Sequence, residues 1–249
     1  ASMPLWSDPY TLVLATDVLI AALFAASLQF ILGPGGMTSF GHAAWFGIGA
    51  YAAALAVKHG WPMPAALALA PAAAMAAAVL LGAFAVRLAG VYLAMLTLAF
   101  AQIVWSIVFQ WDDFTGGSNG LVGVWPSERF ASKTAYYYLT LVLVGASVWM
   151  LRRMLFSPFG YAMRAGRDSP LRAEATGIDV VRVHWAACAA AGLFCGLAGA
   201  LFAFAKGTIS PEAISVARSV DGLVMVLLGG VQTLAGPVVG ATVFTWLQD

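Results

Sequence analysis

The chain has 249 residues, of which 62% are hydrophobic and only 9% are charged, and its formal net charge is +1. Soluble domains carry about 25% charged residues, so this composition excludes an ordinary soluble domain, and the small net charge excludes a general basic surface for nucleic acid. Stretches of roughly twenty residues that are almost free of charge are long enough to cross a bilayer as helices. We therefore predict an all-α, polytopic membrane protein with a single domain over residues 1–249.

About eight apolar segments follow one another along the chain. In order, they cover residues 11–32, 38–57, 65–86, 91–111, 134–151, 185–205, 220–234 and 236–247. Some are short for a hydrocarbon core about 30 Å thick, which predicts broken helices or half-helices among them. Pro71 lies inside the third segment and predicts a kink or a break there.

Four residues in or beside these segments have structural interpretations. Asp17, near one end of the first segment, is interpreted as a helix cap, and Asp179 as a cap for the sixth segment. Gly192 and Gly196 form a G-x-x-x-G pair on the sixth segment, where small residues let helices approach closely in lipid. These features predict packing and helix ends rather than chemistry.

Uncharged polar residues also interrupt the apolar segments. The residues are Gln29, His42, Thr97, Gln102 and Ser106. They could line a path for a polar solute, or they could form hydrogen bonds between helices. For His42 the alternatives are a gate or proton-relay group and a packed, hydrogen-bonded histidine, of which the packed histidine is favoured. No intramembrane carboxylate pair or series of buried charges is evident, so we expect the energy for any pumping to come from another chain.

Half of the basic residues are concentrated in one polar segment. Six of the twelve lie in or just before residues 157–183: Arg152, Arg153, Arg164, Arg167, Arg172 and Arg182. The positive-inside rule places this loop in the cytoplasm and the preceding loop, residues 112–135, outside. Counting back across the segments puts Arg87 inside and Lys58 and Asp17 outside, so the predicted topology is consistent with itself.

The same loop has the signature of two short helices. Ser157-Pro158 and Ser169-Pro170 each predict a helix start with a serine cap, and Gly177 predicts the end of the second helix. A short, well-capped amphipathic helix that faces the cytoplasm is suited to dock in a groove of a partner protein. The alternative is that the arginines anchor the loop at anionic lipid, and the two roles are compatible.

A search for catalytic chemistry is negative. The sequence has no G-x-x-x-x-G-K-[ST] phosphate loop, no G-x-S-x-G nucleophile elbow, and no close cluster of metal ligands around its three histidines. We therefore predict no catalytic residues, no metal site and no cofactor on this chain. A self-contained channel or secondary carrier, and a membrane-embedded enzyme, remain the alternatives to a transport subunit.

Five motifs occur in the order of a known family. They are residues 41–51 (GHAAWFGIGAY), 90–100 (GVYLAMLTLAF), 115–120 (TGGSNG), 157–160 (SPFG) and 228–237 (LGGVQTLAGP). The chain resembles the permease subunits of branched-chain amino acid ABC importers, the LivM type of the LivH/LivM family. Tyr161 stands where the family commonly has an arginine, and Pro170 replaces a more helical residue. The family usually has further apolar segments at both ends, so we expect flanking segments to be missing here.

The resemblance implies an inverted-repeat fold in the bacterial inner membrane and an importer of several chains. These would be a LivH-like second permease, two cytoplasmic ATPases that hold ATP-Mg, and an external solute-binding protein. The solute would be a branched-chain or related amino acid, with urea, short amides and sugars as alternatives within the family. The loop at 157–183 would couple to the ATPase through seven residues: Arg164, Arg167, Asp168, Arg172, Ala173, Glu174 and Gly177.

Overall fold

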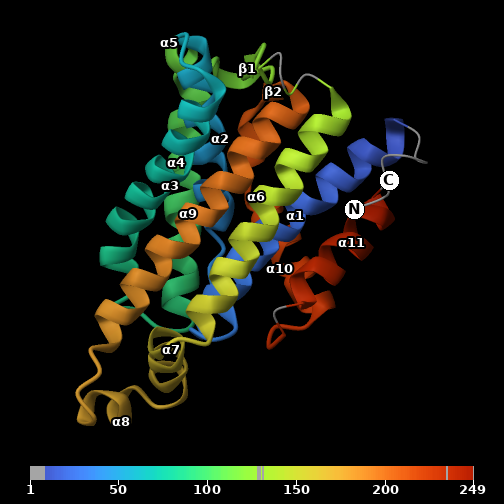
Figure 1. The fold of residues 1–249 in the computed structure, drawn as a ribbon. Coiled ribbons are helices and arrows are strands. Elements are labelled where there is room, and N and C mark those ends of the chain that lie inside the picture. The colour runs from blue at the N-terminus through green and yellow to red at the C-terminus, as the bar shows by residue number, and fades with distance from the viewer. Residues whose placement is uncertain (1–8, 128–129, 131, 234, 249) are drawn as a thin grey trace.

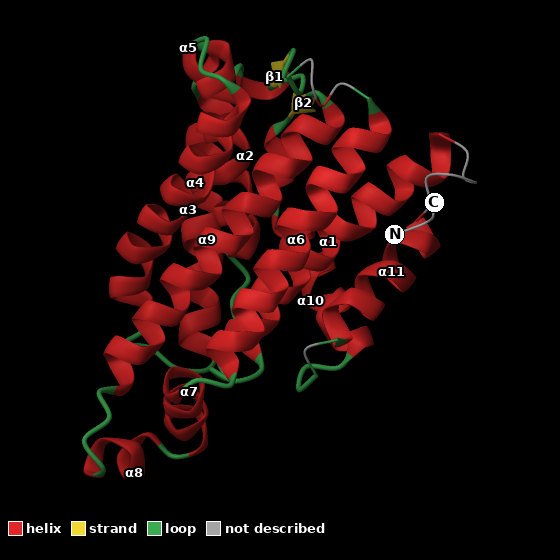
Figure 2. Ribbon diagram, in the orientation of Figure 1, coloured by secondary structure: helices red, strands yellow, loops and turns green. Residues whose placement is uncertain are grey.

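The computed structural model describes residues 9–127, 130, 132–233 and 235–248, which form a bundle of helices (Figures 1 and 2). The parts of the 112–135 loop at Glu128, Arg129 and Ala131, and Leu234 in the last motif, lie outside the described residues. The helices are α1 (Pro9–Leu32), α2 (His42–Lys58), α3 (Met63–Ala85), α4 (Val91–Gln110), α5 (Asp112–Thr115), η2 (Gly117–Asn119), α6 (Lys133–Leu155), α7 (Pro158–Asp168), α8 (Pro170–Ala175), α9 (Val180–Lys206), η4 (Pro211–Ile214), α10 (Val216–Gly229) and α11 (Gly236–Gln248). The short strands β1 (Leu121–Val122) and β2 (Thr208–Ile209) pair antiparallel.

Five of these helices are long and apolar enough to cross a membrane: α1, α3, α4, α6 and α9. The other predicted segments correspond to the shorter apolar helices α2, α10 and α11. This confirms the all-α, polytopic fold and the presence of shortened helices. The predicted break at Pro71 is wrong, because α3 continues through this proline as one helix.

The two ends of the bundle differ as the charge pattern predicts. Figure 1 shows α7 and α8 at one end and α5 with both strands at the other. The α3–α4 turn with Arg87 lies at the α7 end, and Lys58, at the close of α2, lies at the strand end. By the positive-inside rule, we predict that the end that carries α7 and α8 is cytoplasmic.

Two shortened helices begin inside the bundle and meet there. Beyond α1 the chain is not helical over residues 36–41, so α2 begins at His42 rather than at the predicted residue 38. Beyond α9, β2 and η4 lead to α10, which begins at Val216 rather than at residue 220. The amide of Ala43 donates to Ser219 Oγ at 3.0 Å and so joins the first turns of both helices. The break before α2 lies near α7, where Arg167 contacts Gly33, whereas the break before α10 begins at the strand end with β2 (Figure 1).

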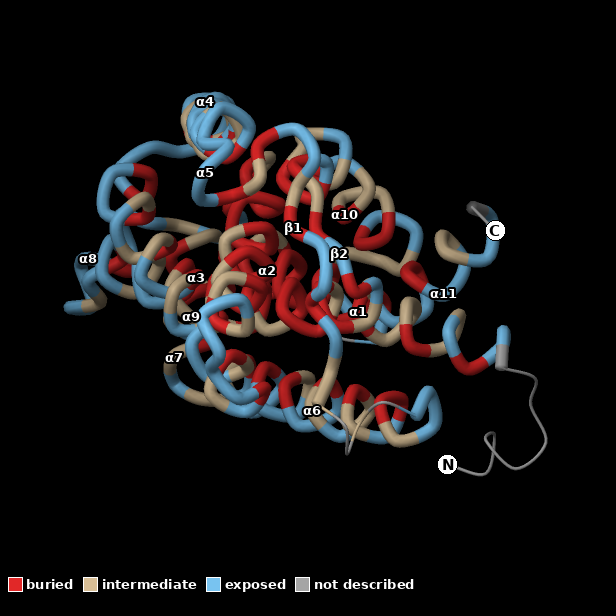
Figure 3. Tube along the Cα trace, turned by 90° about the horizontal axis from the view of Figure 1, so that it is seen from above, coloured by how far each residue is buried: buried red, intermediate tan, exposed pale blue. Residues whose placement is uncertain are grey.

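Small residues allow the central helices to pack backbone against backbone. A Cβ added to Gly192 or Gly196 would collide with alanines of α3, so the predicted G-x-x-x-G face packs within the chain. Four α3 alanines one turn apart meet this face and are fully buried: Ala66, Ala70, Ala74 and Ala78. On its other side, α9 packs on α2 where Gly199 meets the backbone of Phe46. Figure 3 shows the buried residues gathered around α2, with exposed faces outside on α4 and α6.

Candidate functional site

The polar loop between α6 and α9 forms the two predicted short helices. Pro158 and Pro170 open α7 and α8, and Gly177, at φ +87°, follows the end of α8 in the left-handed region that glycine tolerates. The serine caps are wrong: Ser157 Oγ instead donates to the Met154 carbonyl at 2.6 Å, and Ser169 forms no side-chain cap. Prolines with a favourable fixed φ therefore start both helices without serine caps.

The cap at the start of α9 is the predicted one, although the helix begins earlier than predicted. Asp179 Oδ1 accepts a hydrogen bond from the Arg182 amide at 3.0 Å, which confirms the predicted cap. The helix begins at Val180, five residues before the predicted apolar segment. The polar loop therefore ends earlier than its composition indicates.

The Arg167 side chain points toward the helix bundle. Its Nη1 donates to the Gly33 carbonyl at 2.7 Å, its aliphatic stem lies against Gly36, and its Nε donates to Asp168 at 2.9 Å. Gly33 and Gly36 belong to the segment between α1 and α2. Arg167 therefore connects α7 to the break that precedes α2.

The remaining loop residues divide into an inner and an outer group. Arg164 lies over the Phe156 and Tyr161 rings at 5.8 and 5.5 Å, and Ala173 is only 4% exposed. The exposed members of the predicted set are Asp168, Arg172, Glu174 and Gly177. Leu171 was not predicted, yet its side chain is 81% exposed on α8, which is the helix farthest from the bundle in Figure 1.

The polar residues predicted for a solute path do not gather in one place. Gln29 is buried, and its Nε2 donates to the Val231 carbonyl at 2.9 Å. His42 is fully buried, with Nε2 at 2.8 Å from Ser27 Oγ. Thr97 Oγ1 donates to the Ala94 carbonyl and accepts from the Phe40 amide. These contacts are hydrogen bonds between helices and to the backbone, which is the predicted alternative to a solute path.

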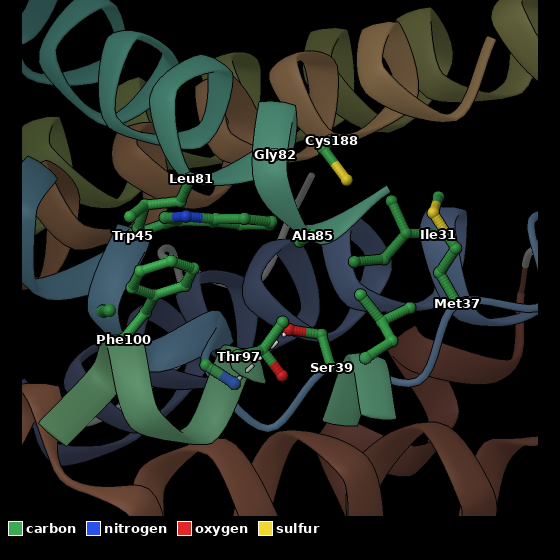
Figure 4. A pocket seen from close by; sticks show the side chains of 13 residues that line it. Ile31, Met37, Ser39, Trp45, Leu81, Gly82, Ala85, Thr97, Phe100 and Cys188 are labelled. Carbon is green, nitrogen blue, oxygen red and sulfur yellow. Dashed lines mark hydrogen bonds between the residues drawn. The ribbon is translucent and has the colours of Figure 1, made fainter. Parts of the chain in front are cut away.

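Thr97 also lines a small pocket between α1, α2, α3 and α4. Figure 4 shows it with Ser39, the aromatic rings of Trp45 and Phe100, and the thiol of Cys188. The pocket has a volume of about 20 Å³, and a single water needs about 10–15 Å³. It is therefore too small to hold an organic solute in this conformation.

The other two predicted path residues lie on the outside of α4. Gln102 is exposed, and Ser106 is half-buried and accepts from Gln110 Nε2 at 2.9 Å. Residues four apart share a helix face, so these three side chains form a polar stripe opposite the face that packs on the bundle through Ala101 and Val108. The polar stripe of α4 is therefore turned away from this chain.

Charged residues gather at a site that sequence reasoning missed. Asp17 is not a cap: it lies within α1, and its Oδ2 pairs with Lys206 Nζ of α9 at 2.7 Å. Arg218 and Asp221 lie on α10 and line a cavity of about 190 Å³ together with that pair. An arginine and an aspartate three residues apart at the start of an apolar segment were the available signal. Lys206 is exposed and the other three residues are half-buried, so they are not the series of buried charges whose absence was noted from the sequence.

Long apolar helices, two shortened helices that meet inside the bundle and a basic loop at one end define a polytopic membrane permease. The chain belongs to the family described as branched-chain amino acid transport system / permease component, whose model matches residues 10–249. The fold and the family place it in the bacterial inner membrane as a multi-pass membrane protein.

Two curated proteins are similar to this chain. One is the high-affinity branched-chain amino acid transport system permease protein LivM of Escherichia coli (strain K12), 30% identical over 248 residues that cover 88% of this chain and 58% of that protein. The LivM protein of Salmonella typhimurium (strain LT2) is also 30% identical, with 87% and 58% covered. The chain therefore spans less than two thirds of the length of these relatives. No solved structure matches it.

Proposed function

We propose that this chain is a permease subunit of a binding-protein-dependent ABC importer for branched-chain or related amino acids. In this proposal a LivH-like permease completes the translocation path, two cytoplasmic ATPases bind and hydrolyse ATP-Mg, and an external protein delivers the solute. The observation that carries the proposal is α8, a short helix with exposed Leu171, Arg172 and Glu174 that projects from the arginine-rich end.

The exposed face of α8 has the composition of a docking helix. Leu171 offers an apolar anchor, while Arg172 and Glu174 beside it offer charges for a polar rim. Anionic lipid attracts Arg172 but repels Glu174, so lipid anchoring alone does not account for this face. A groove in a cytoplasmic partner accommodates both kinds of side chain.

We expect a Leu171→Asp, Arg172→Glu, Glu174→Lys variant to lose association with the ATPase. A charge placed at an apolar anchor leaves a desolvated ion in the interface, and reversed rim charges oppose the partner, so the affinity should fall roughly 100-fold. Copurification of the ATPase with the detergent-solubilised complex measures this loss. All three residues are exposed, so the fold should persist.

The matched control is Leu88→Asp, because Leu88 is 41% exposed in the α3–α4 turn at the same end of the bundle. It should retain the ATPase. Undiminished copurification of the triple variant would show that α8 does not dock the ATPase.

The polar stripe of α4 supports a path shared with a second permease. Gln102 makes no side-chain hydrogen bond within the described residues and is exposed on a membrane-spanning helix. Lipid offers no hydrogen-bond partner for such a group, so a polar stripe facing lipid carries a cost. A second subunit that lines a solute path with α4 would give the stripe polar surroundings.

We expect Gln102→Leu to lower solute uptake while leaving stability unchanged, and Gln29→Leu to lower stability. Losing one polar contact along the path should reduce uptake roughly three- to tenfold, since such contacts contribute about 0.6–1.4 kcal/mol. Gln29→Leu removes the hydrogen bond to the Val231 carbonyl. Uptake at equal expression and thermal unfolding in detergent separate the two effects. Unchanged uptake with Gln102→Leu would remove α4 from the path.

A further inference from the structure

A charged cavity lies between α1, α9, α10 and α11, toward the strand end of the bundle. It has a volume of about 190 Å³ and is distinct from the small pocket in Figure 4. Pockets for drug-sized ligands measure about 300–1,000 Å³, so this one suits a smaller molecule. Ile20, Met225 and Phe244 give it apolar walls, while its charged residues lie on α1, α9 and α10.

The charges around the cavity are only partly compensated. Asp17 and Lys206 neutralise one another at 2.7 Å. Neither the Arg218 guanidinium nor the Asp221 carboxylate forms an ion pair with any other described residue. Charged groups within a membrane bundle are costly, and they commonly mark functional sites. The two residues carry opposite charges and attract one another without a direct ion pair. Neither side chain makes a hydrogen bond to another described residue, so both can bind a ligand.

Aromatic rings hold the Arg218 guanidinium beside the cavity. Its Cζ lies 4.9 Å from the ring centroid of Phe202 and 5.3 Å from that of Phe46. Ring faces stabilise the cation without using its N–H groups. The N–H groups of the planar guanidinium thus remain available, and two of them can donate to the two oxygens of one carboxylate.

Asp221 lies three residues from Arg218 on the same helix. Positions three apart on a helix are neighbours on one face, and both residues line the cavity. A free α-amino acid carries a carboxylate and an ammonium group on the same carbon. It would pair with both charged side chains at once, whereas an uncharged solute such as urea or a sugar offers no charge to either.

We propose that this cavity binds a zwitterionic α-amino acid with an aliphatic side chain. Arg218 binds the α-carboxylate, Asp221 binds the α-ammonium group, and Ile20, Met225 and Phe244 surround the side chain. This inference rests on the proposed function and deepens it, because it assigns the solute a binding site on this chain. The Asp17–Lys206 pair closes one side of the site without competing for the ligand charges.

The test is ligand binding to the assembled transporter in nanodiscs, without the solute-binding protein. The probes are leucine, leucine amide, which lacks the carboxylate, and 4-methylpentanoate, which lacks the ammonium group. Arg218→Gln should weaken leucine roughly 10- to 100-fold but leave the amide unchanged. Asp221→Asn should weaken leucine similarly but leave 4-methylpentanoate unchanged. Lys58→Gln and Asp113→Asn, which remove exposed charges at the same end, should bind leucine like the wild type.

The outcomes separate this inference from the proposed function. If both cavity variants bind leucine normally, or weaken all three probes equally, the site assignment is overturned. Arg218→Lys keeps the positive charge but lacks the paired N–H donors of the guanidinium, so its leucine affinity should lie between those of the wild type and Arg218→Gln. This variant provides the test if Arg218→Gln folds poorly. If the complete wild-type transporter takes up no amino acid, the proposed function itself fails, whereas normal uptake by wild type and cavity variants alike refutes only this site.

Discussion

Gly199→Ala should destabilise the protein, although alanine favours a helix. Gly199 lies on α9, where an added Cβ would collide with the Phe46 carbonyl and come within 3.0 Å of the Ala50 amide of α2. These are backbone atoms, so no side-chain rotation relieves the collision, and the two helices must separate. We expect a loss of about 1–3 kcal/mol in the free energy of unfolding, and a larger loss with leucine. Unfolding in mixed detergent micelles measures it.

Gly145→Ala provides the matched control. Gly145 lies in the middle of α6, and a Cβ there would have no heavy atom within 4 Å. The same substitution should therefore stabilise α6 by up to about 1 kcal/mol through helix propensity alone. A similar gain at both glycines would contradict the backbone packing of α2 on α9.

The glycines show how far the sequence predicts the packing. Gly192 and Gly196 were recognisable as a close-packing face because their spacing places them on one side of a helix. Their partner was not recognisable, because the alanine stripe of α3 has no signal that distinguishes it from any other alanine-rich helix. Gly49 meets Gly196 and Gly199 meets Phe46 because the break before α2 sets the position along the helix axes at which α2 packs on α9.

The charged cavity could not be predicted from the sequence, for a related reason. Asp17 was interpreted as a helix cap, and it lies far in the sequence from Lys206, Arg218 and Asp221, so no local pattern brings the four residues together. The early start of α10 brings Arg218 and Asp221 into the bundle. By contrast, the predicted sidedness rests on the number of basic residues in each loop, a local property that folding does not alter, and the α7 end carries Arg87 as expected.

The 157–183 loop contains two groups of residues that its sequence does not distinguish. The seven predicted coupling residues form one group in the sequence, but the structure turns Arg167 inward and Arg172 and Glu174 outward. The outward group lies on α8 and has the proposed docking role. The inward contact of Arg167 joins α7 to residues 33–36, from which the chain leads to His42 and the first turn of α2. Movement of α7 would therefore reach the bundle interior through Arg167.

Arg167→Ala should uncouple ATP hydrolysis from transport. It removes the hydrogen bond to the Gly33 carbonyl and the stem that packs on Gly36, while the docking face of α8 is unaltered. Coupling energies between sites are typically about 1–3 kcal/mol, or roughly 5–150-fold. We expect solute transported per ATP hydrolysed to fall by a factor within this range, with normal copurification of the ATPase. Uptake and ATPase rates in proteoliposomes provide the ratio.

Two further variants separate contact from charge. Arg167→Lys keeps the charge but cannot engage Gly33 and Asp168 together through a fork of N–H groups, so its coupling should lie between wild type and Arg167→Ala. Arg153→Gln removes an exposed charge at the end of α6, where the guanidinium lies over Trp149, and should couple normally. A comparable loss with Arg153→Gln would mean that positive charge at this end matters rather than the link to Gly33. Normal coupling in Arg167→Ala would require motion to reach α2 through another contact of α7, such as its packing on α9 through Gly166 and Val180.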